Sequence, residues 1–296
     1  MRTTGSQGSR GARGVISKLL LAVALFAAGV ALMATAAFYI LPLSIAEQML
    51  KDSLREQGAL VSWQSLGRTF PFGLKASGVE VVDISTNRPV VRLEEAGVRL
   101  DLPGLLGGVL RFPLNARMGR GVITGVADIR LQGALLDMEA TGVEIDAIPV
   151  VAALNVRTKG SVGGTLSMRL PWDGCPAGSV RLRSGRIDGN GVRFMGLPLS
   201  LGDIEQAGLN AELGNCKVVV EGMWVDGSEL SAKLAGELVP MAPLAASRLD
   251  MTLEVTPKGN LAGQQWLLSF ISPYRRSSNY YYMTIRGTFA QPVIGR

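Results

Sequence analysis

The chain has 296 residues, of which 47% are hydrophobic and 18% are charged. This composition supplies enough apolar material for one large domain or two modest ones, and it excludes a disordered chain. Histidine is absent from the sequence, which removes the commonest general base, the commonest metal ligand and every Ser-His or Cys-His nucleophile pair.

The net charge of +6 does not indicate a nucleic-acid partner, because much of it is concentrated at the N-terminus. Arg2, Arg10, Arg13 and Lys18 come before any acidic residue. Subtracting these four from the 30 basic residues leaves 26 against 24 acidic ones. The body of the protein is therefore nearly neutral, and we expect no nucleic-acid surface.

The first hydrophobic segment predicts a transmembrane helix over Leu19–Leu41, which has 23 residues. As a helix it spans roughly 35 Å, enough for a bilayer core of about 30 Å. The flanking Arg10, Arg13 and Lys18 place residues 1–18 in the cytoplasm, and Tyr39 falls where an interfacial aromatic side chain is expected. We therefore expect a single-pass membrane protein whose remaining chain is exported.

The alternative for this segment is a cleavable signal peptide, because Ala34-Thr35-Ala36 matches an A-x-A cleavage site behind a short basic region. The apolar run continues through Leu41, which is longer than the usual signal core and favours the anchor. Residues 42–296 are exported under both interpretations.

Both cysteines, Cys175 and Cys216, lie in the exported part, where an oxidising compartment permits a disulfide. We predict that they are bonded to each other, and the alternative is two separate buried thiols. The bond closes a loop of 42 residues, counting both ends, and should stabilise the fold by roughly 3–4 kcal/mol.

The segment 42–58 predicts a juxtamembrane helix. Ser44 and Glu47 have the spacing of a capping box, and Gly58 is placed to terminate the helix. Its apolar residues fall on one face: Ile45, Met49, Leu50 and Leu54. This helix either packs onto the first strands, which we favour, or lies on the membrane surface.

Residues 59–296 predict a β-rich domain, because apolar and polar residues alternate with a period of two. Clear examples are Leu166–Leu170, Leu230–Leu234 and Leu249–Val255. Proline closes several such runs, as at Pro171, Pro240, Pro257 and Pro292, because it lacks an amide donor. The fold class is therefore mainly β: a curved, mostly antiparallel sheet with a few short helices.

Two later stretches, Asp146–Leu154 and Leu261–Ile271, lack alternation and predict short helices. The first could separate an N-terminal sheet from a C-terminal one. Gly-Ser turns followed by alternating strands, at Gly160 and Gly227, indicate repeated hairpins rather than a strict solenoid.

The sequence offers no constellation of residues for catalysis, cofactor binding or metal binding. The glycine clusters lack the lysine and the following helix of a phosphate loop. Glu94 and Glu95 are neighbours on a predicted strand, so they face opposite sides, and we expect them to be solvated. The scattered Asp101, Asp128, Asp137 and Asp146 have no metal-binding spacing. We expect no enzyme activity.

Tyr280-Tyr281-Tyr282, near Arg275 and Arg276, could stack on bases or glycans. A strand with large residues on both faces explains this run more simply. The broad apolar face of the sheet is more informative. It must be buried in a core or used for an acyl chain or a partner strand, and the sequence does not choose among these.

Three local sequences, together with the overall organisation, carry a family resemblance: Phe70-Pro71-Phe72-Gly73-Leu74, Gly174-Cys175-Pro176-Ala177-Gly178 and the ending Ile285–Pro292. In these sequences the chain resembles the general secretion pathway protein N family of bacterial type II secretion systems. It also resembles that family in its organisation: a basic start, one membrane helix and an exported β-rich region. The ending and the anchored sheet also resemble AsmA-like envelope proteins.

The first resemblance implies an inner-membrane accessory with a periplasmic body, acting as a scaffold through contacts with other type II secretion system or envelope proteins. The second implies a module that binds or transfers membrane lipids, with an acyl chain in a hydrophobic groove. Neither resemblance brings a catalytic residue or a cofactor.

Overall fold

The computed structural model describes residues 42–56, 59–84, 87–148, 159–189, 192–194, 197–199, 202–241, 246–263 and 268–295. The predicted transmembrane helix and its flanks Arg10, Arg13, Lys18 and Tyr39 lie outside these ranges.

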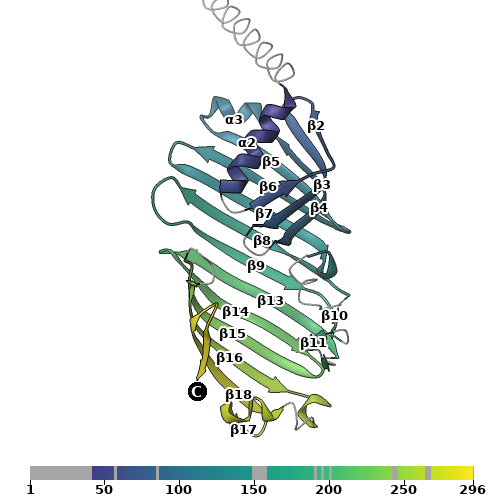
Figure 1. Cartoon of the computed structure of the whole chain (residues 1–296), viewed down its shortest axis with the longest axis vertical. Coiled ribbons are helices and arrows are strands. Elements are labelled where there is room, and N and C mark those ends of the chain that lie inside the picture. Colours follow the sequence, from purple (N-terminus) through teal and green to yellow (C-terminus); the bar gives the residue numbers. More distant parts are fainter. Residues whose placement is uncertain are drawn as a thin grey trace, which may run out of the picture.

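The helix expected after the membrane segment is α2, Leu43–Glu56 (Figure 1). It begins one residue before Ser44, so that residue lies inside the first turn and not at the expected N-cap position. Lys51 Nζ lies 2.6 Å from Glu47 Oε1, one turn earlier in the helix. The helix packs against the first strand, as favoured from the sequence.

The described strands form one 17-stranded antiparallel sheet and one small hairpin. The first part contains β1 Ala59–Ser62, β2 Ser65–Thr69, β3 Gly73–Asp83, β4 Arg88–Arg99, β5 Leu110–Met118, β6 Gly121–Arg130, β7 Gly133–Glu144, β8 Ser161–Pro171 and β9 Ala177–Ser184. The second part contains β10 Ile187–Asp188, β13 Asp203–Gly214, β14 Lys217–Gly227, β15 Leu230–Val239, β16 Arg248–Pro257, β17 Arg275–Ser277, β18 Tyr280–Thr288 and β19 Pro292–Gly295. The separate hairpin is β11 Val192–Phe194 with β12 Leu197–Leu199.

Strands that follow one another in the chain are neighbours in the sheet. From β3 to β9 each strand pairs with the next, β9 pairs with β13, and the series continues through β16 to β18. At one end β1 and β2 pair end to end along β3, and at the other β17 and β19 pair end to end along β18. The result is a long curved sheet with the predicted antiparallel, mainly β architecture (Figure 1).

The stretch after Asp146 does not divide the sheet. Among described residues it contributes only a 3₁₀ turn, Ile145–Ala147, and residues 149–158 lie outside them. Strands β7 and β8 on either side pair directly, with Val143 opposite Val162. The possible separation into two sheets is therefore wrong, because the main-chain ladder continues across this connection.

Other short elements differ from the sequence predictions. Within the expected helix Leu261–Ile271, Leu261–Gly263 forms a 3₁₀ turn, Leu268 and Ser269 are helical, and residues 264–267 lie outside the described ranges. A second 3₁₀ turn, Ser272–Tyr274, follows this stretch. Proline ends β8 and β16 as expected, but Pro292 begins β19 instead of closing a strand. A proline at the first residue of an edge strand needs no donor in the ladder.

A disulfide joins Cys175 to Cys216, as predicted, with Cα atoms 5.1 Å apart. Cys175 lies in the loop between β8 and β9, and Cys216 lies in the two-residue turn between β13 and β14. The bond therefore links two turns beside the pairing of β9 with β13. Asn215 and Cys216 both have positive φ, as a tight hairpin turn of this type requires.

Replacing both cysteines, Cys175→Ser with Cys216→Ser, should lower the free energy of unfolding by roughly 3–4 kcal/mol, because the unfolded chain loses a cross-link. Urea unfolding of the full chain followed by circular dichroism measures this change. Reductant should destabilise the natural protein by a similar amount and leave the double variant unchanged. Equal stability of the two proteins without reductant would contradict a stabilising bond.

Candidate functional site

The candidate site is one face of the sheet, on which apolar side chains continue from strand to strand. Residues directly opposite each other in an antiparallel pair lie on the same face. In the first part of the sheet, Leu114 is opposite Gly125, Gly125 is opposite Met138, and Met138 is opposite Leu166. Leu166 is opposite Val180, which is opposite Ala211 across the junction of β9 and β13.

The same register defines what we call the apolar face. In β5 to β9 its members are Phe112, Leu114, Ala116, Met118, Ile123, Ala127, Ile129, Ala134, Leu136, Met138, Leu166, Met168, Leu170, Val180 and Leu182. In β13 to β18 they are Leu209, Ala211, Leu213, Val218, Val220, Met223, Val225, Ala232, Leu234, Leu238, Leu249, Met251, Leu253, Val255, Tyr281, Met283 and Ile285.

The opposite face is polar and carries ion pairs and side-chain hydrogen bonds. Arg111 Nε lies 2.8 Å from Asp128 Oδ1, Lys217 Nζ lies 2.7 Å from Glu237 Oε1, and Arg286 Nε lies 3.1 Å from Asp250 Oδ1. Such pairs across neighbouring strands belong on a solvated surface. The sheet therefore has one apolar face and one mainly polar face, on which Val126, Leu135 and Trp224 are apolar exceptions.

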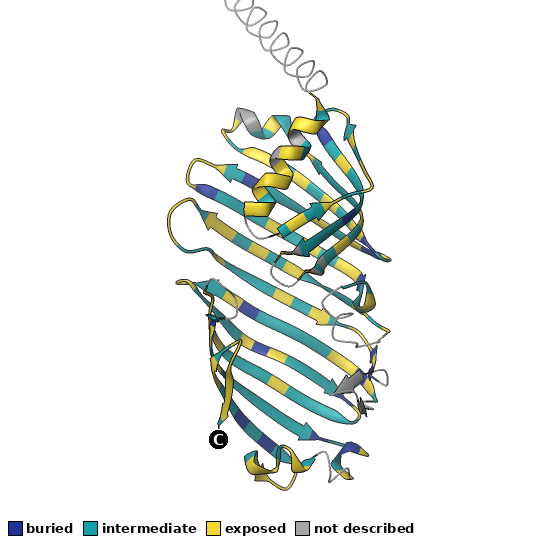
Figure 2. Cartoon of the chain, viewed as in Figure 1, coloured by how far each residue is buried: buried dark blue, intermediate teal, exposed yellow. Residues whose placement is uncertain are grey.

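Most of the apolar face is only half-buried (Figure 2). Its central members Leu166, Val180, Leu182 and Leu209 are all of intermediate exposure. The principal contacts of β8, β9, β14 and β15 are with their neighbours in the sheet, and α2 packs at the N-terminal end. A contiguous apolar surface of this kind, left without a second layer by the described residues, is a candidate binding surface.

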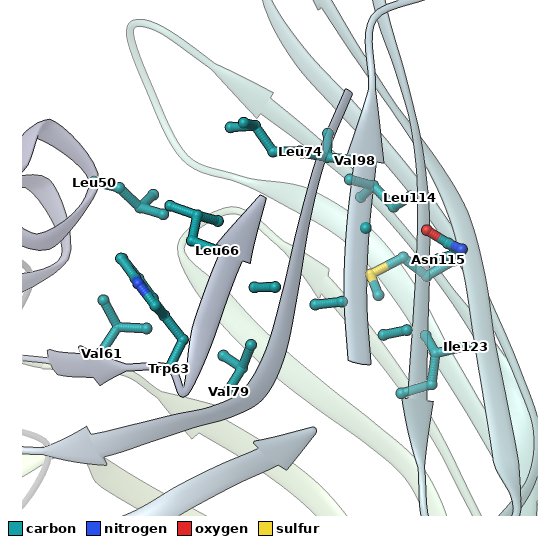
Figure 3. A pocket seen from close by; sticks show the side chains of 15 residues that line it. Leu50, Val61, Trp63, Leu66, Leu74, Val79, Val98, Leu114, Asn115 and Ile123 are labelled. Carbon is teal, nitrogen blue, oxygen red and sulfur yellow. The ribbon is translucent and has the colours of Figure 1, made fainter. Parts of the chain in front are cut away.

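The N-terminal end of the apolar face is covered and forms a cavity of about 310 Å³. In Figure 3, Leu50, Trp63 and Leu66 lie on one side of it, and Leu114 and Ile123 lie on the other. The remaining lining residues are Val61, Leu74, Ala76, Val79, Ala96, Gly97, Val98, Asn115, Ala116 and Met138. Because Leu114, Ile123 and Met138 also belong to the apolar face, the cavity continues into that face.

Helix α2 and the segment around Trp63 form the cover of this cavity. Lys51 Nζ lies 4.8 Å from the centre of the Trp63 ring, a cation–π contact that links the helix to the first strands. Leu50 remains 47% exposed although it lines the cavity. The cavity is therefore open to solvent beside the helix.

Gly125 lies on β6 directly beside Met138, a residue that lines the cavity. A Cβ atom at this position would lie 2.6 Å from the carbonyl oxygen of Asp137 and 2.9 Å from Met138 Cγ. A larger residue would displace β7, and with it the Met138 side chain that lines the cavity.

Two other cavities lie where the lining is more polar. One is lined by Lys75, Arg99 and Asn115 among others, and one lies beside Trp224 with Asn210, Glu221 and Lys233. Across the part of the chain that the structure describes, histidine, cysteine and carboxylate residues form no cluster able to hold a metal ion.

Asp128 is the most enclosed carboxylate of the polar face, with its side chain 10% exposed. Arg111 donates to both of its oxygens, at 2.8 and 2.9 Å, and Arg130 Nη2 lies 3.5 Å away. The hydrogen bonds from Arg111 lower the pKa of Asp128, against an opposing effect of burial. This carboxylate is a structural partner of two arginines.

The structure places the two groups singled out from the sequence, the Glu94-Glu95 pair and the Tyr280–Tyr282 run, on separate strands of the sheet. Glu94 is exposed and Glu95 is half-buried, and both lie near Arg117, at 3.0 and 3.7 Å, so they are paired and not only solvated. Tyr281 is buried on the apolar face, and Tyr282 lies on the other face, 5.7 Å from Arg276. The tyrosine run is thus a strand with large residues on both sides, as preferred from the sequence.

The predicted membrane anchor is not among the described residues, and none of the helices within them is long and apolar enough to cross a membrane. Sequence reasoning missed the covered cavity. Trp63 carried no periodic signal, because it lies between β1 and β2, and the approach of α2 to β5 and β6 depends on the curvature of the sheet.

Comparisons with known proteins identify no relative. No protein-family model, no curated protein and no solved structure matches the chain.

Replacing Asp128 by Asn should lower the free energy of unfolding at pH 7 by about 1–2 kcal/mol, because the charge-assisted bonds to Arg111 weaken. The pKa of Asp128 is lower in the folded state, so its stabilising effect is present above the unfolded-state pKa of about 4 and is lost as pH falls through the folded value.

The difference between natural protein and variant, measured by urea unfolding, should therefore shrink between pH 5 and pH 3. Asp137→Asn is the matched control, since Asp137 lies on the same face and is exposed. A pH-independent difference at Asp128 would show that its charge is not what stabilises the fold.

Proposed function

We propose that this protein binds the acyl chains of lipids along the apolar face of its sheet. One observation carries the proposal: apolar residues continue on a single face from β5 to β18, and the described residues provide no second layer over most of it. Transfer of apolar surface out of water is favourable, and a flexible acyl chain satisfies a long, narrow apolar surface without a fixed hydrogen-bond pattern.

The covered cavity supports the same proposal. It lies at the end of the apolar face nearest the predicted membrane segment, since α2 begins at Leu43 and that segment ends at Leu41. A chain leaving a bilayer would meet the cavity beside Leu50 and Trp63 before reaching the rest of the face. The protein then acts as a lipid-binding or lipid-transfer component, anchored in the inner membrane with its body in the periplasm.

A second candidate function is a scaffold of the type II secretion system. It is favoured by the C-terminal edge of the sheet, where β19 pairs only with β18 among the described strands. Val293 and Ile294 of this short edge strand are 64% and 51% exposed. An open edge with apolar side chains suits pairing with a strand of another envelope protein.

Lipid binding is tested with a photo-crosslinking amino acid at Leu182, on the apolar face, and at Arg181, its neighbour on the polar face. The full-length chain is expressed in cells supplied with an alkyne-labelled fatty acid. Irradiation should attach label at position 182 several-fold more than at position 181, because successive residues of a strand point to opposite faces.

The matching substitution is Leu182→Glu, with Arg181→Glu as its control. The first should lower the phospholipid that co-purifies with the chain several-fold, and the second should leave it unchanged. Thermal unfolding checks that both variants are folded. Equal labelling at both positions, together with equal lipid content in both variants, would overturn the acyl-chain proposal.

The scaffold function is tested with the same photo-crosslinking amino acid at Ile294, compared with Thr288 at the end of β18. Crosslinks from position 294 to secretion-system proteins, identified by mass spectrometry, are the expected result of strand pairing at this edge. Absence of such crosslinks, with normal protein secretion in a deletion strain, would discard it.

A further inference from the structure

Exposed large apolar side chains gather along one long rim of the sheet. The rim contains the β2–β3, β6–β7, β8–β9, β13–β14 and β18–β19 turns, the start of β5 and the end of β15. From β6 onward it lies on the left in Figure 1, whereas β2 lies at the upper right. Its exposed members, which we call the apolar rim, are Phe70, Leu110, Leu131, Leu170, Trp172, Val239, Met241 and Phe289. Those described on the opposite rim are Leu60, Ile84, Val122 and Phe270.

Leu131 and Trp172 are the most prominent pair of the apolar rim. Leu131 is 97% exposed at the tip of the β6–β7 turn, and Trp172 is 62% exposed in the β8–β9 loop. The Trp172 indole donates a hydrogen bond to the carbonyl oxygen of Arg130, at 3.2 Å, and the disulfide of Cys175 holds the same loop. Two apolar side chains are thus presented to solvent on well-anchored turns.

The hydrogen bond from the Trp172 indole allows this side chain to enter an apolar environment. Because its only donor is already satisfied inside the chain, the ring can enter an apolar environment without leaving a polar group unpaired. Leu131 carries no polar group in its side chain. Both can therefore be inserted among acyl chains at small cost, and exposing them to water instead is unfavourable.

Arginines flank these apolar side chains. Arg99 and Arg248 are exposed at strand ends of the same rim. Arg130 is also exposed there, but its Nη2 lies 3.5 Å from Asp128 Oδ2. Arginine heads reach anionic lipid headgroups while apolar neighbours enter the boundary of the acyl region, and each basic residue near such a surface favours binding. A membrane contact of this kind depends on the predicted membrane segment, which ends at Leu41, just before α2.

We infer that the apolar rim is a membrane-contact surface, along which the sheet lies on an anionic bilayer with Leu131 and Trp172 inserted. This contact goes beyond the proposed acyl-chain binding and does not require a bound chain. Its consequence is geometric: one long side of the apolar face then opens next to the bilayer, so a lipid can reach that face from the side as well as through the covered end.

The test compares Leu131 with Ile84, an aliphatic residue that is 44% exposed beside the β3–β4 turn on the opposite rim. Full-length protein with a photo-crosslinking amino acid at either position is reconstituted in nanodiscs of phosphatidylglycerol and phosphatidylcholine carrying an alkyne-labelled acyl chain. We expect several-fold more labelled lipid on position 131 than on position 84. Equal labelling, or crosslinks from position 131 only to protein, would overturn the inference.

A second measurement tests the role of charge. The pair Arg99→Gln with Arg248→Gln should lower labelling at position 131 several-fold in anionic nanodiscs and change little in nanodiscs of phosphatidylcholine alone. Arg120→Gln with Arg275→Gln, which lie at the other rim, should have no such effect. Failure at position 131 with successful labelling at Leu182 would reject membrane contact and keep acyl-chain binding, and the reverse result would do the opposite.

Discussion

The structure depends on one continuous ladder of main-chain hydrogen bonds that runs across the sheet from β3 to β18. In a globular β-protein a second sheet or a layer of helices buries the apolar side of such a ladder. Here the ladder satisfies the backbone groups of every central strand by itself, while the side chains of one face receive little cover from the described residues. The backbone polar groups are thus hydrogen-bonded within the sheet. What remains incompletely buried is the apolar side chains of one face.

Most strands of the sheet form their main-chain hydrogen bonds with the strands before and after them in the chain. Hairpin connections place consecutive strands side by side with short loops, so the sheet grows along the chain without long-range crossovers. Longer connections join β7 to β8, β9 to β13 and β16 to β18. The passage from β9 to β13 contains β10 and the small β11–β12 hairpin. A ladder closed by a long connection costs more chain entropy than one closed by a tight turn. The Cys175–Cys216 bond lies beside this pairing, where a cross-link offsets that cost most directly.

Sequence periodicity was sufficient for the strands and insufficient for the site. Alternation in Leu166–Leu170 and Leu249–Val255 predicts β8 and β16, because a strand with one apolar face places apolar residues at every second position. The same signal could not say whether that face is covered, since a buried face and a ligand-bound face have the same alternation. Pro292 shows a second limit: proline disfavours a central ladder position, but it does not distinguish the end of one strand from the start of the next edge strand.

The cavity under α2 shows why three-dimensional curvature was the missing information. Leu50 and Ile123 lie 73 positions apart in the sequence, and nothing in their local patterns relates them. They line one cavity because β1 and β2 pair end to end along β3, which brings Trp63 and the helix before it over the strands that follow. Curvature turns the first strands toward β5 and β6 and creates a covered end, whereas the C-terminal end finishes in the short edge strand β19 without a corresponding helix among the described residues.

An apolar face that is covered at one end and open at the other gives a bound chain a direction. Any ligand that moves along it would therefore travel between the covered end of the face and its open end.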